Sequence, residues 1–362
     1  MTEEMSSKHY KKKASLKDIA EAAGVSKMTV SRYLNPRKRM EVAPVKRAKI
    51  EMAIQKLDYT PNIFARKRRA LEKYRIGILT SLSKHIMQSG YHMGLVSGIL
   101  DRVFRTGHEL ELFQLKEDRT YDNVEEILSE HGIDGLLIIT WRMDLDIIRL
   151  IEKTRASLPL IVFNDYYPKF PGNILYVDPR EGMELAVSYL AEKDYRKIGY
   201  LGRPNEIIFE VGERKVRLPS VDGKEKLGGF LEAMKEKKMS VRKEWIRECD
   251  SYKDTDGYNE MKAWIKEGKL PRAIVCANDE LALGAMRALK EVKMWCPEKM
   301  ALVGYDDIER GRVVSPSLTT IRQPLYQMGQ ESVDILIEKI EFQGKESVQK
   351  RYAPELIVRQ TA

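Results

Sequence analysis

The chain has 362 residues, of which 43% are hydrophobic, and a formal net charge of +9, which suits a small module joined to a larger, bilobed domain. No run of about eighteen apolar residues could span a bilayer, and the first residues lack the apolar segment of a signal peptide, so we expect a cytoplasmic protein with no membrane partner. The cysteines are far apart and have no CxxC spacing, so neither a disulfide framework nor a metal site is expected at Cys249, Cys276 and Cys296.

The positive charge is concentrated near the N-terminus. Residues 8–75 hold 20 Lys and Arg against six Asp and Glu, so the rest of the chain is net negative. Nucleic acid is the partner that best explains this distribution, because each phosphate that a cation neutralises releases counterions and strengthens binding. A solvated basic extension would explain residues 1–13, but not the basic residues that alternate with helical apolar periodicity farther along.

Residues 14–60 are expected to form a three-helix domain with a helix-turn-helix. Ser15 and Asp18 have the spacing of a capping box at the start of a first helix. Gly24 supplies a left-handed turn, and Ser26 can cap a second helix. The apolar residues expected to face inward from the second helix and from a third helix over residues 44–57 are Val30, Leu34, Val45, Ile50, Ala53, Ile54 and Leu57.

In helix-turn-helix geometry the second helix lies in the major groove of double-stranded DNA. The expected base readers are Lys27, Met28 and Arg32. The arginine fork matches the two acceptors of guanine, whereas a methionine offers only apolar contact. Short polar side chains that could reach phosphates, or that could instead be local caps, are Ser26, Thr29, Ser31 and Asn35.

Residues 61–74 are expected to be a linker that contains a short helix. Pro61 ends the third helix, and Asn62 can cap a helix that runs from residue 63 to about residue 71. This stretch carries consecutive basic residues, Arg66, Lys67, Arg68 and Arg69.

From residue 75 to residue 362, short apolar strands alternate with helical stretches, which predicts doubly wound parallel sheets with helices on both faces. The expected strands are 76–80, 109–115, 135–140, 160–163, 197–201, 273–277, 301–304 and 356–359. Ligands of such sheets bind outside the carboxyl ends of the strands. The polar or aromatic residues directly after these strands are Thr140, Trp141, Asn164, Asp165, Asn278, Asp279, Asp306 and Asp307. Asn278 and Asp279 could instead cap a helix that begins at Glu280, and Asp306 could cap a turn.

These residues resemble the lactose and galactose repressor (LacI/GalR) family. The similar N-terminal segments are Leu16-Lys-Asp-Ile-Ala, Ala23-Gly-Val-Ser, Thr29-Val-Ser-Arg and Tyr59-Thr-Pro-Asn followed by Ala65-Arg66. Further blocks that resemble the family begin at Ala277, Val303 and Ser317. The resemblance implies an N-terminal three-helix helix-turn-helix domain and a hinge helix, followed by an α/β bilobed domain like that of periplasmic binding proteins. The function it implies is a repressor whose operator affinity is controlled by a small molecule, a sugar or sugar derivative, bound between the two lobes.

The resemblance also implies roles for individual residues. Asp165, Asn278 and Asp306 would hydrogen-bond the effector, and Tyr252 would stack on it. The near lobe would contribute Tyr91, His92 and Trp141, and the far lobe Lys226, where the family usually has an arginine. Hinge contacts to DNA would come from Asn62, Ala65, Arg66 and Arg68. Arg68 stands where the family usually has a leucine that wedges between base pairs.

The expected assembly is a homodimer on a pseudo-palindromic operator, since no leucine heptad that would assemble tetramers follows the last strand. No cofactor and no catalytic residue is expected, because the chain lacks a G-x-S-x-G elbow, a phosphate-binding loop and an H-E-x-x-H motif. A solute-binding protein, the other class with this type of sensor domain, would need an export signal. Residues 206–220 exceed the usual loop of the family and are interpreted as a flap over the ligand or a solvated loop.

Overall fold

The computed structural model describes residues 16–34, 42–57, 73–80, 89–114, 122–139, 151, 153, 157–163, 172–203, 206–211, 214–219, 221–342 and 346–362. The chain divides into two compact units: Met1–Lys73 with Ile337–Glu346, and Tyr74–Leu336 with Ser347–Ala362. None of the helices in the described ranges is long and apolar enough to cross a membrane.

Residues 16–57, where the structure describes them, form three short helices around one small core. Their bounds are α1 (Leu16–Ala23), α2 (Lys27–Leu34) and α3 (Pro44–Lys56). Each contributes a fully buried aliphatic residue, Ile19, Val30 or Ile50. A further link comes from Tyr33, whose hydroxyl donates to Glu51 Oε1 over 2.6 Å and ties α2 to α3.

The expectation that Val45 packs inward is wrong, because its side chain is 70% exposed. Val45 lies five residues before Ile50, which places it about 140° away around the helix. Val42, just before α3, is buried instead.

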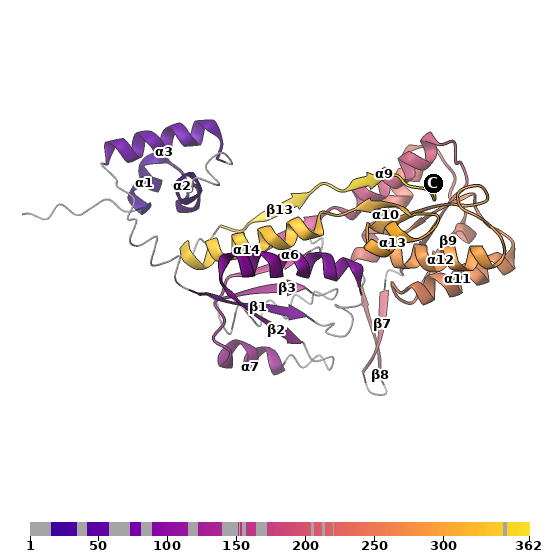
Figure 1. The fold of residues 1–362 in the computed structure, drawn as a ribbon, viewed down its shortest axis with the longest axis horizontal. Coiled ribbons are helices and arrows are strands. Elements are labelled where there is room, and N and C mark those ends of the chain that lie inside the picture. The colour runs from indigo at the N-terminus through magenta and orange to yellow at the C-terminus, as the bar shows by residue number, and fades with distance from the viewer. Residues whose placement is uncertain are drawn as a thin grey trace, which may run out of the picture. The chain divides into compact units, whose positions relative to one another are not determined.

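The N-terminal lobe of the second unit is an all-parallel sheet in the order β13-β5-β4-β3-β1-β2. Its strands are β1 (Arg75–Thr80), β2 (Glu109–Gln114), β3 (Gly135–Ile139), β4 (Leu160–Phe163), β5 (Asn173–Val177) and β13 (Gln349–Tyr352). The helices bounded within the described residues are α6 (Gly90–Thr106), α7 (Asp122–Glu130) and α14 (Leu325–Phe342), with α6 and α14 side by side and α7 across the sheet (Figure 1). Only a glycine fits at Gly98 of α6, because a Cβ there would lie 2.0 Å from the carbonyl oxygen of Tyr326 in α14.

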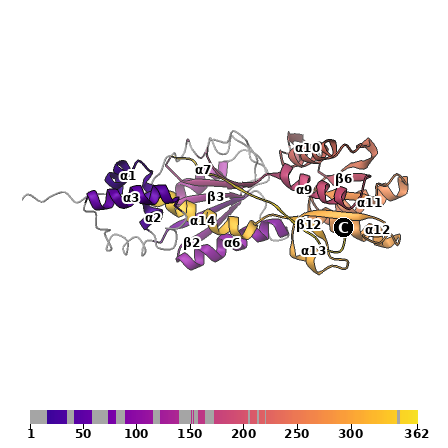
Figure 2. The ribbon, with the colours of Figure 1, turned by 90° about the horizontal axis from the view of Figure 1, so that it is seen from above.

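The C-terminal lobe is a second sheet in the order β14-β12-β11-β10-β6-β9, parallel except for β14. Its strands are β6 (Ile198–Gly202), β9 (Ile246–Glu248), β10 (Ala273–Cys276), β11 (Ala301–Asp306), β12 (Thr319–Arg322) and β14 (Glu355–Ile357). Its helices are α9 (Pro179–Glu192), α10 (Val221–Glu236), η2 (Lys243–Trp245), α11 (Asp254–Glu267), α12 (Asp279–Glu291) and α13 (Glu309–Val313). The crossover from β6 to β9 runs toward one edge of the sheet, and those from β9 to β10 and from β10 to β11 run the opposite way. Because all are right-handed, α10 lies on one face and α11 and α12 lie on the other. Helix α9 lies beside α10 (Figure 2).

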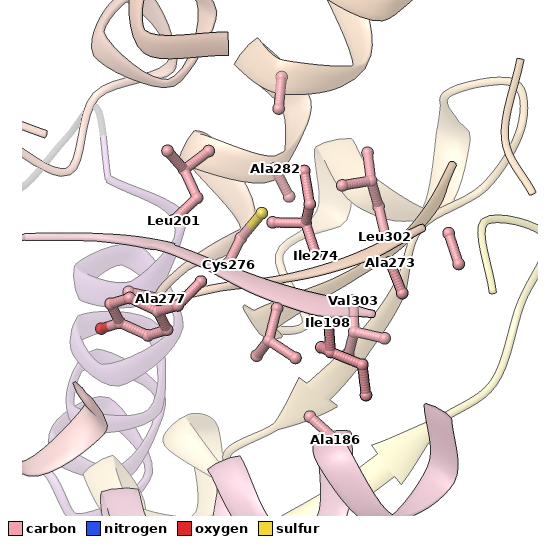
Figure 3. Packing of buried hydrophobic residues seen from close by; sticks show 14 of the residues in the cluster. Ala186, Ile198, Leu201, Ala273, Ile274, Cys276, Ala277, Ala282, Leu302 and Val303 are labelled. Atoms are coloured by element: carbon pink, nitrogen blue, oxygen red, sulfur yellow. The ribbon is translucent and has the colours of Figure 1, made fainter. Parts of the chain in front are cut away.

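The core of the C-terminal lobe explains why its strands read as continuous apolar runs. Every residue of β6, β10 and β11 is buried, as expected for parallel strands that are covered on both faces. Figure 3 shows Ile198, Ile274 and Val303 from these three strands packed together with Ala186 and Ala282 from the flanking helices. The chain passes between the lobes after β5, after β12 and between β13 and β14. The predicted class, two doubly wound parallel sheets after a three-helix module, is confirmed.

Residues 206–219 are not an irregular loop. They form an antiparallel hairpin of β7 (Glu206–Val211) and β8 (Arg214–Pro219), inserted between β6 and α10. The apolar residues Ile207, Phe209 and Val211 recur at the period of two that a strand requires, with Ile208 as a further apolar residue between them. The insertion that was expected to be a flap or a solvated loop therefore contains a regular two-stranded ladder.

Candidate functional site

The turn between α1 and α2 has the geometry that its sequence predicts. Gly24 has φ of 62°, in the left-handed region that favours glycine. The backbone N–H of Thr29 donates to the Ser26 hydroxyl over 3.2 Å, so Ser26 caps α2. The hydroxyls of Ser26 and Thr29 are themselves 3.0 Å apart. The local capping alternative thus accounts for the contacts of these two side chains in the absence of DNA.

The remaining predicted DNA contacts of α2 share one side of the helix. Lys27 is exposed, and Met28, Ser31 and Arg32 are half-buried. Lys27 and Ser31 are four residues apart, as are Met28 and Arg32, so each pair lies on neighbouring turns of the same face.

Several predicted contact residues lie outside the described part of the chain. For DNA these are Asn35, Asn62, Ala65, Arg66 and Arg68, and for the effector Trp141 and Asp165.

Predicted and additional residues meet at the carboxyl edge of the C-terminal sheet. Arg203 follows β6, Tyr252 follows β9, Asn278 follows β10, and Asp306 ends β11. Helix α10 adds Lys226 to the same place. We call this group, with Asp222 and Tyr305, the carboxyl-edge site.

Lys226 is the buried cation of this site, with 5% of its surface exposed. Its Nζ lies 3.2 Å from Asp222 Oδ1, 4.5 Å from the ring centre of Tyr305 and 5.3 Å from that of Tyr252. The Tyr252 hydroxyl donates to the other oxygen of Asp222. The guanidinium of Arg203 lies 5.4 Å from the Tyr252 ring centre. Asp222 therefore joins an ammonium to a phenol, and two cations contact one aromatic ring.

Burial controls the protonation of the aromatic hydroxyls at this site. It raises the pKa of Tyr252 and of Tyr305 well above the usual value. The nearby charge of Asp222 raises the pKa of Tyr252 further, and the charge of Asp306 raises the pKa of Tyr305 further. Burial also lowers the pKa of Arg203. Both phenols thus stay protonated near neutral pH and remain able to donate hydrogen bonds.

Asn278 has a structural role that uses both ends of its amide. Its Oδ1 accepts from the Leu281 N–H over 2.9 Å and caps α12, which begins at Asp279 and not at Glu280. Its Nδ2 donates to the carbonyl of Tyr252 over 3.1 Å. The capping alternative therefore describes this residue, and the same contacts hold the Tyr252 loop against α12.

Asp306 ends β11 in an unusual backbone conformation, with φ of 111°. Its Oδ1 accepts from Gln323 Nε2 over 2.8 Å, and only 8% of the residue is exposed. Burial raises the pKa of Asp306 to about 7, although Lys226 and the Gln323 hydrogen bond lower it. Near neutral pH the Asp306 carboxyl group is therefore partly protonated, so it can donate or accept a hydrogen bond.

This raised pKa gives the stability of the domain a testable pH dependence. Between the ordinary Asp value of 3.8 and about 7, the folded state binds more protons at Asp306 than the unfolded state does, so stability falls as pH rises through this window, by up to about 1.4 kcal/mol per pH unit. Asp306→Asn is expected to flatten this decline. Urea unfolding of both proteins at pH 5, 6, 7 and 8 measures it, and equal slopes in the two proteins would refute the assignment.

The other two carboxylates that follow these strands are built into the fold. Asp279 is fully buried and accepts from the Thr320 hydroxyl over 2.5 Å and from the Ile308 N–H over 2.8 Å. Asp307 is bound by arginines from three segments, Arg312, Arg322 and Arg359. Neither carboxylate is part of the carboxyl-edge site.

Two predicted residues of the N-terminal lobe, Tyr91 and His92, lie at the start of α6. Tyr91 and His92 pack edge to face with ring centres 5.1 Å apart. Next to them, Gly90 is so close to Ile308 that a Cβ would lie 2.5 Å from its side chain. The Tyr91 charge is also among the groups that raise the pKa of Tyr305. The start of α6 therefore contacts the C-terminal lobe beside Asp306.

Sequence reasoning missed Arg203, Asp222, Tyr305 and Gln323. The spacing of Asp222 and Lys226, four residues apart on one helix, was the available signal for an ion pair. Tyr305 follows an apolar run and has an apolar-type side chain with 1% exposure, so a hydrophobicity pattern does not distinguish it from a core residue.

Comparison with known sequences identifies both parts of the chain. Residues 15–62 match the model of bacterial regulatory proteins of the lacI family, and residues 187–362 match that of a periplasmic binding protein-like domain. The HTH-type transcriptional repressor PurR of Haemophilus influenzae (strain PittEE) is 31% identical over 353 residues, covering 96% of this chain and 98% of the relative. That of Pasteurella multocida (strain Pm70) is 30% identical over 354 residues, with the same coverage of both chains.

Solved structures agree. The lac repressor dimer bound to operator and the anti-inducer ONPF has a TM-score of 0.67 at 27% identity and covers 97% of this chain and 99% of its own. The complex of the transcriptional regulator CelR with cellobiose has a TM-score of 0.69 at 23% identity, covers 96% of this chain and all of its own, and supports the fold alone. The chain therefore belongs to the lacI family of bacterial regulatory proteins and is a DNA-binding transcriptional regulator under the control of an effector.

Proposed function

We propose that the chain is a cytoplasmic repressor that binds a pseudo-palindromic operator as a homodimer and responds to a hydroxyl-rich effector, a sugar or sugar derivative. The effector binds at the carboxyl-edge site, between the two lobes, and is faced by Tyr91 and His92. The observation that supports this most is a pair of carboxyl groups around Lys226: Asp222, which also accepts from the Tyr252 hydroxyl, and Asp306, whose pKa the Lys226 charge lowers. Carboxylates satisfy vicinal hydroxyls, and an aromatic face covers the apolar side of a sugar ring.

A purine is the alternative effector, since relatives that match nearly the whole chain are named PurR repressors. A flat heterocycle could stack on Tyr252 and hydrogen-bond Asp306 as well as a sugar could. A thermal-shift screen of sugars, sugar phosphates, uronates and purines separates the two, because a ligand that binds only the folded state raises its melting temperature. If only purine bases raise the melting temperature of the protein, the effector is a purine and not a sugar, and the rest of the proposal is unchanged.

We assign a function to each segment of the chain at the domain boundaries that the sequence predicts. Residues 1–13 are a basic extension, 14–60 read DNA, 61–74 are the hinge, and 75–362 bind the effector and dimerise. In the hinge, Asn62, Ala65 and Arg66 contact the minor groove. Arg68 replaces a wedge with a cation, which suits the narrow, strongly negative groove of an A·T-rich operator centre.

Exposed apolar side chains support dimerisation of the larger unit. In the N-terminal lobe, Phe104 of α6 is 76% exposed and Leu112 of β2 is 54% exposed. In the C-terminal lobe, Val313 is 73% exposed, and Trp295 lines a pocket of about 270 Å³ beside α12. Such side chains mark a protein interface where they form a contiguous patch, and we propose these positions for the dimer interface on that basis.

Arg32→Ala tests the reading of DNA by α2. If Arg32 makes two hydrogen bonds to a guanine, its loss should weaken operator binding by about 1–3 kcal/mol per half-site and relax the preference at one base position. Selection of binding sequences from random DNA by both proteins, followed by titration on the selected operator, measures this effect.

Lys13→Ala is the control for that experiment, because a cation that contacts only phosphate should weaken binding to all sequences alike and reduce the salt dependence. An equal loss on operator and random DNA for Arg32→Ala would show that Arg32 is not a base reader. Failure of the wild-type chain to enrich any sequence would refute the proposed function itself.

A further inference from the structure

Tyr200 of β6 carries a buried hydroxyl group that has no hydrogen-bond partner in the described part of the chain. The residue is fully buried, and its hydroxyl oxygen is unpaired. By contrast, the Tyr189 hydroxyl donates to the Ala362 backbone oxygen over 2.8 Å, and the Tyr252 hydroxyl donates to Asp222. A phenylalanine would fill the same space as Tyr200 without burying an unpaired polar group, which costs free energy. Core packing therefore does not explain the Tyr200 hydroxyl.

The hydroxyl end of the Tyr200 ring points toward the carboxyl end of β6. A Cβ on Gly202, the last residue of this strand, would overlap with the Tyr200 hydroxyl oxygen. On α10, Phe230 packs on the Tyr200 ring with ring centres 5.4 Å apart. Asp222 and Lys226 precede Phe230 by eight and four residues, so they lie on the same face of this helix. The Tyr200 ring therefore lies along this face of α10, with its hydroxyl directed to the carboxyl-edge site.

Two groups of the carboxyl-edge site interact electrostatically with this hydroxyl. Burial raises the pKa of Tyr200 well above its usual value, and among the charged groups Asp222 raises it most. Tyr200 is in turn one of the groups that raise the pKa of Tyr252. The Tyr200 hydroxyl therefore stays protonated near neutral pH and lies near Asp222 and Tyr252 without bonding to either.

Asp222 and Tyr200 make complementary demands on a group that binds between them. The Asp222 carboxylate already accepts from Lys226 and from the Tyr252 hydroxyl, and it has no proton to donate. The Tyr200 hydroxyl has a proton to donate. A group that contacts both residues must donate to Asp222 and accept from Tyr200. A hydroxyl does both with one oxygen atom, whereas an ionised carboxylate cannot donate and an ammonium cannot accept.

We propose that Tyr200 is a ligand-binding residue of the effector site, whose hydroxyl donates to an effector hydroxyl that in turn donates to Asp222. This inference rests on the proposed function and deepens it, because it specifies the group of the effector that lies deepest in the site. Since Tyr200 has no exposed surface, the effector hydroxyl takes the place of the Tyr252 hydroxyl at Asp222. The exchange replaces one hydroxyl with another at the same acceptor and adds the bond from Tyr200.

Monodeoxy sugars test this assignment. The probes are D-glucose, D-galactose, D-xylose, D-ribose and D-glucuronate, followed by the monodeoxy analogues of whichever sugar raises the melting temperature most. The wild-type chain should bind one of these analogues at least about tenfold more weakly than the parent sugar, because that analogue leaves Asp222 and Tyr200 without their shared partner. Calorimetry gives the dissociation constants.

Tyr200→Phe removes only the hydroxyl oxygen. This variant should bind the parent sugar about tenfold more weakly than the wild type does, and should bind the discriminated analogue as the wild type does. The melting temperature of the free protein should not fall, because no hydrogen bond is lost. Tyr189→Phe is the matched control. It removes a hydroxyl that is bonded to Ala362, so it should lower the melting temperature and leave the sugar affinity unchanged.

A lower melting temperature of free Tyr200→Phe would overturn the inference, because the hydroxyl would then stabilise the fold through a bonded water. Equal affinities of the wild type and Tyr200→Phe for the parent sugar would also overturn it, as would a wild type that discriminates against no monodeoxy analogue. Binding of purine bases alone would overturn this inference and leave the regulator with a purine effector. A sugar that binds through Tyr200 but does not alter operator affinity would instead refute the proposed function and leave the role of Tyr200 standing.

Discussion

Asp307→Ala is expected to lower the free energy of unfolding of the larger unit by about 3 kcal/mol, because removing one partner of a buried charge network leaves the others unbalanced. The Asp307 side chain is 1% exposed and accepts from Arg312 over 2.9 Å, from Arg322 over 2.7 Å and from Arg359. It thereby joins α13, β12 and the C-terminal segment. The loss lies near the lower end of the range for buried pairs, since the Arg312 and Arg322 side chains are 46% and 39% exposed and can regain water.

Glu309→Ala is the matched control. Glu309 lies 3.6 Å from the same Arg312, but its side chain is 78% exposed, so its loss should change stability by less than about 0.5 kcal/mol. Urea unfolding of the wild type and both variants at pH 7 measures the difference. Equal stabilities of the two variants would show that the buried network contributes no more than a surface pair.

The difference in stability between the wild type and Asp307→Ala should depend on pH in a definite direction. Burial raises the pKa of Asp307, but hydrogen bonds from Arg322, Arg359 and Arg312 outweigh it and hold the pKa below the usual 3.8. Because the folded-state pKa is depressed, the stabilisation is complete above the unfolded-state value and is lost as pH falls through the folded-state value. The gap between wild type and Asp307→Ala should therefore persist from pH 7 to pH 5 and close only in more acid solution.

The two-sheet architecture could be predicted because central parallel strands are apolar along their whole length, as in β4 and β10. The strands β9 and β13 were missed because they form sheet edges and carry Arg247, Glu248, Lys350 and Arg351. In β12, burial depends on hydrogen bonds, such as that from Thr320 to Asp279, which a hydrophobicity pattern does not detect.

Ligands of parallel sheets bind beyond the carboxyl ends of the strands, and this rule was sufficient to select Asn278 and Asp306, because it depends only on where the strands end. It could not decide between a cap and a ligand contact at Asn278, since both roles use the same residue type at the same position. Asp222 was missed for a different reason: it comes from the start of a helix, on the far side of the hairpin in sequence.

Loss of the effector response in Asp306→Ala is the second large effect expected. Truncation removes an acceptor at the centre of the carboxyl-edge site, and the loss of a hydrogen bond to a charged group should weaken effector binding by about 10–100-fold. Asp306 belongs to the larger unit, whereas the predicted base readers Lys27, Met28 and Arg32 belong to the first. Operator affinity without effector should therefore stay within about twofold of the wild type.

Titration of the selected operator by fluorescence anisotropy, with and without the compound that raises the melting temperature, tests the coupling of the two units most directly. For the wild type and for Glu309→Ala, the effector should change the operator dissociation constant by at least about fivefold, the lower end of typical allosteric coupling. For Asp306→Ala, the response at a compound concentration near the wild-type effector dissociation constant should nearly vanish, because the variant binds the compound about 10–100-fold more weakly. A full response in Asp306→Ala would contradict the account, as would a wild-type chain whose operator affinity no stabilising compound alters.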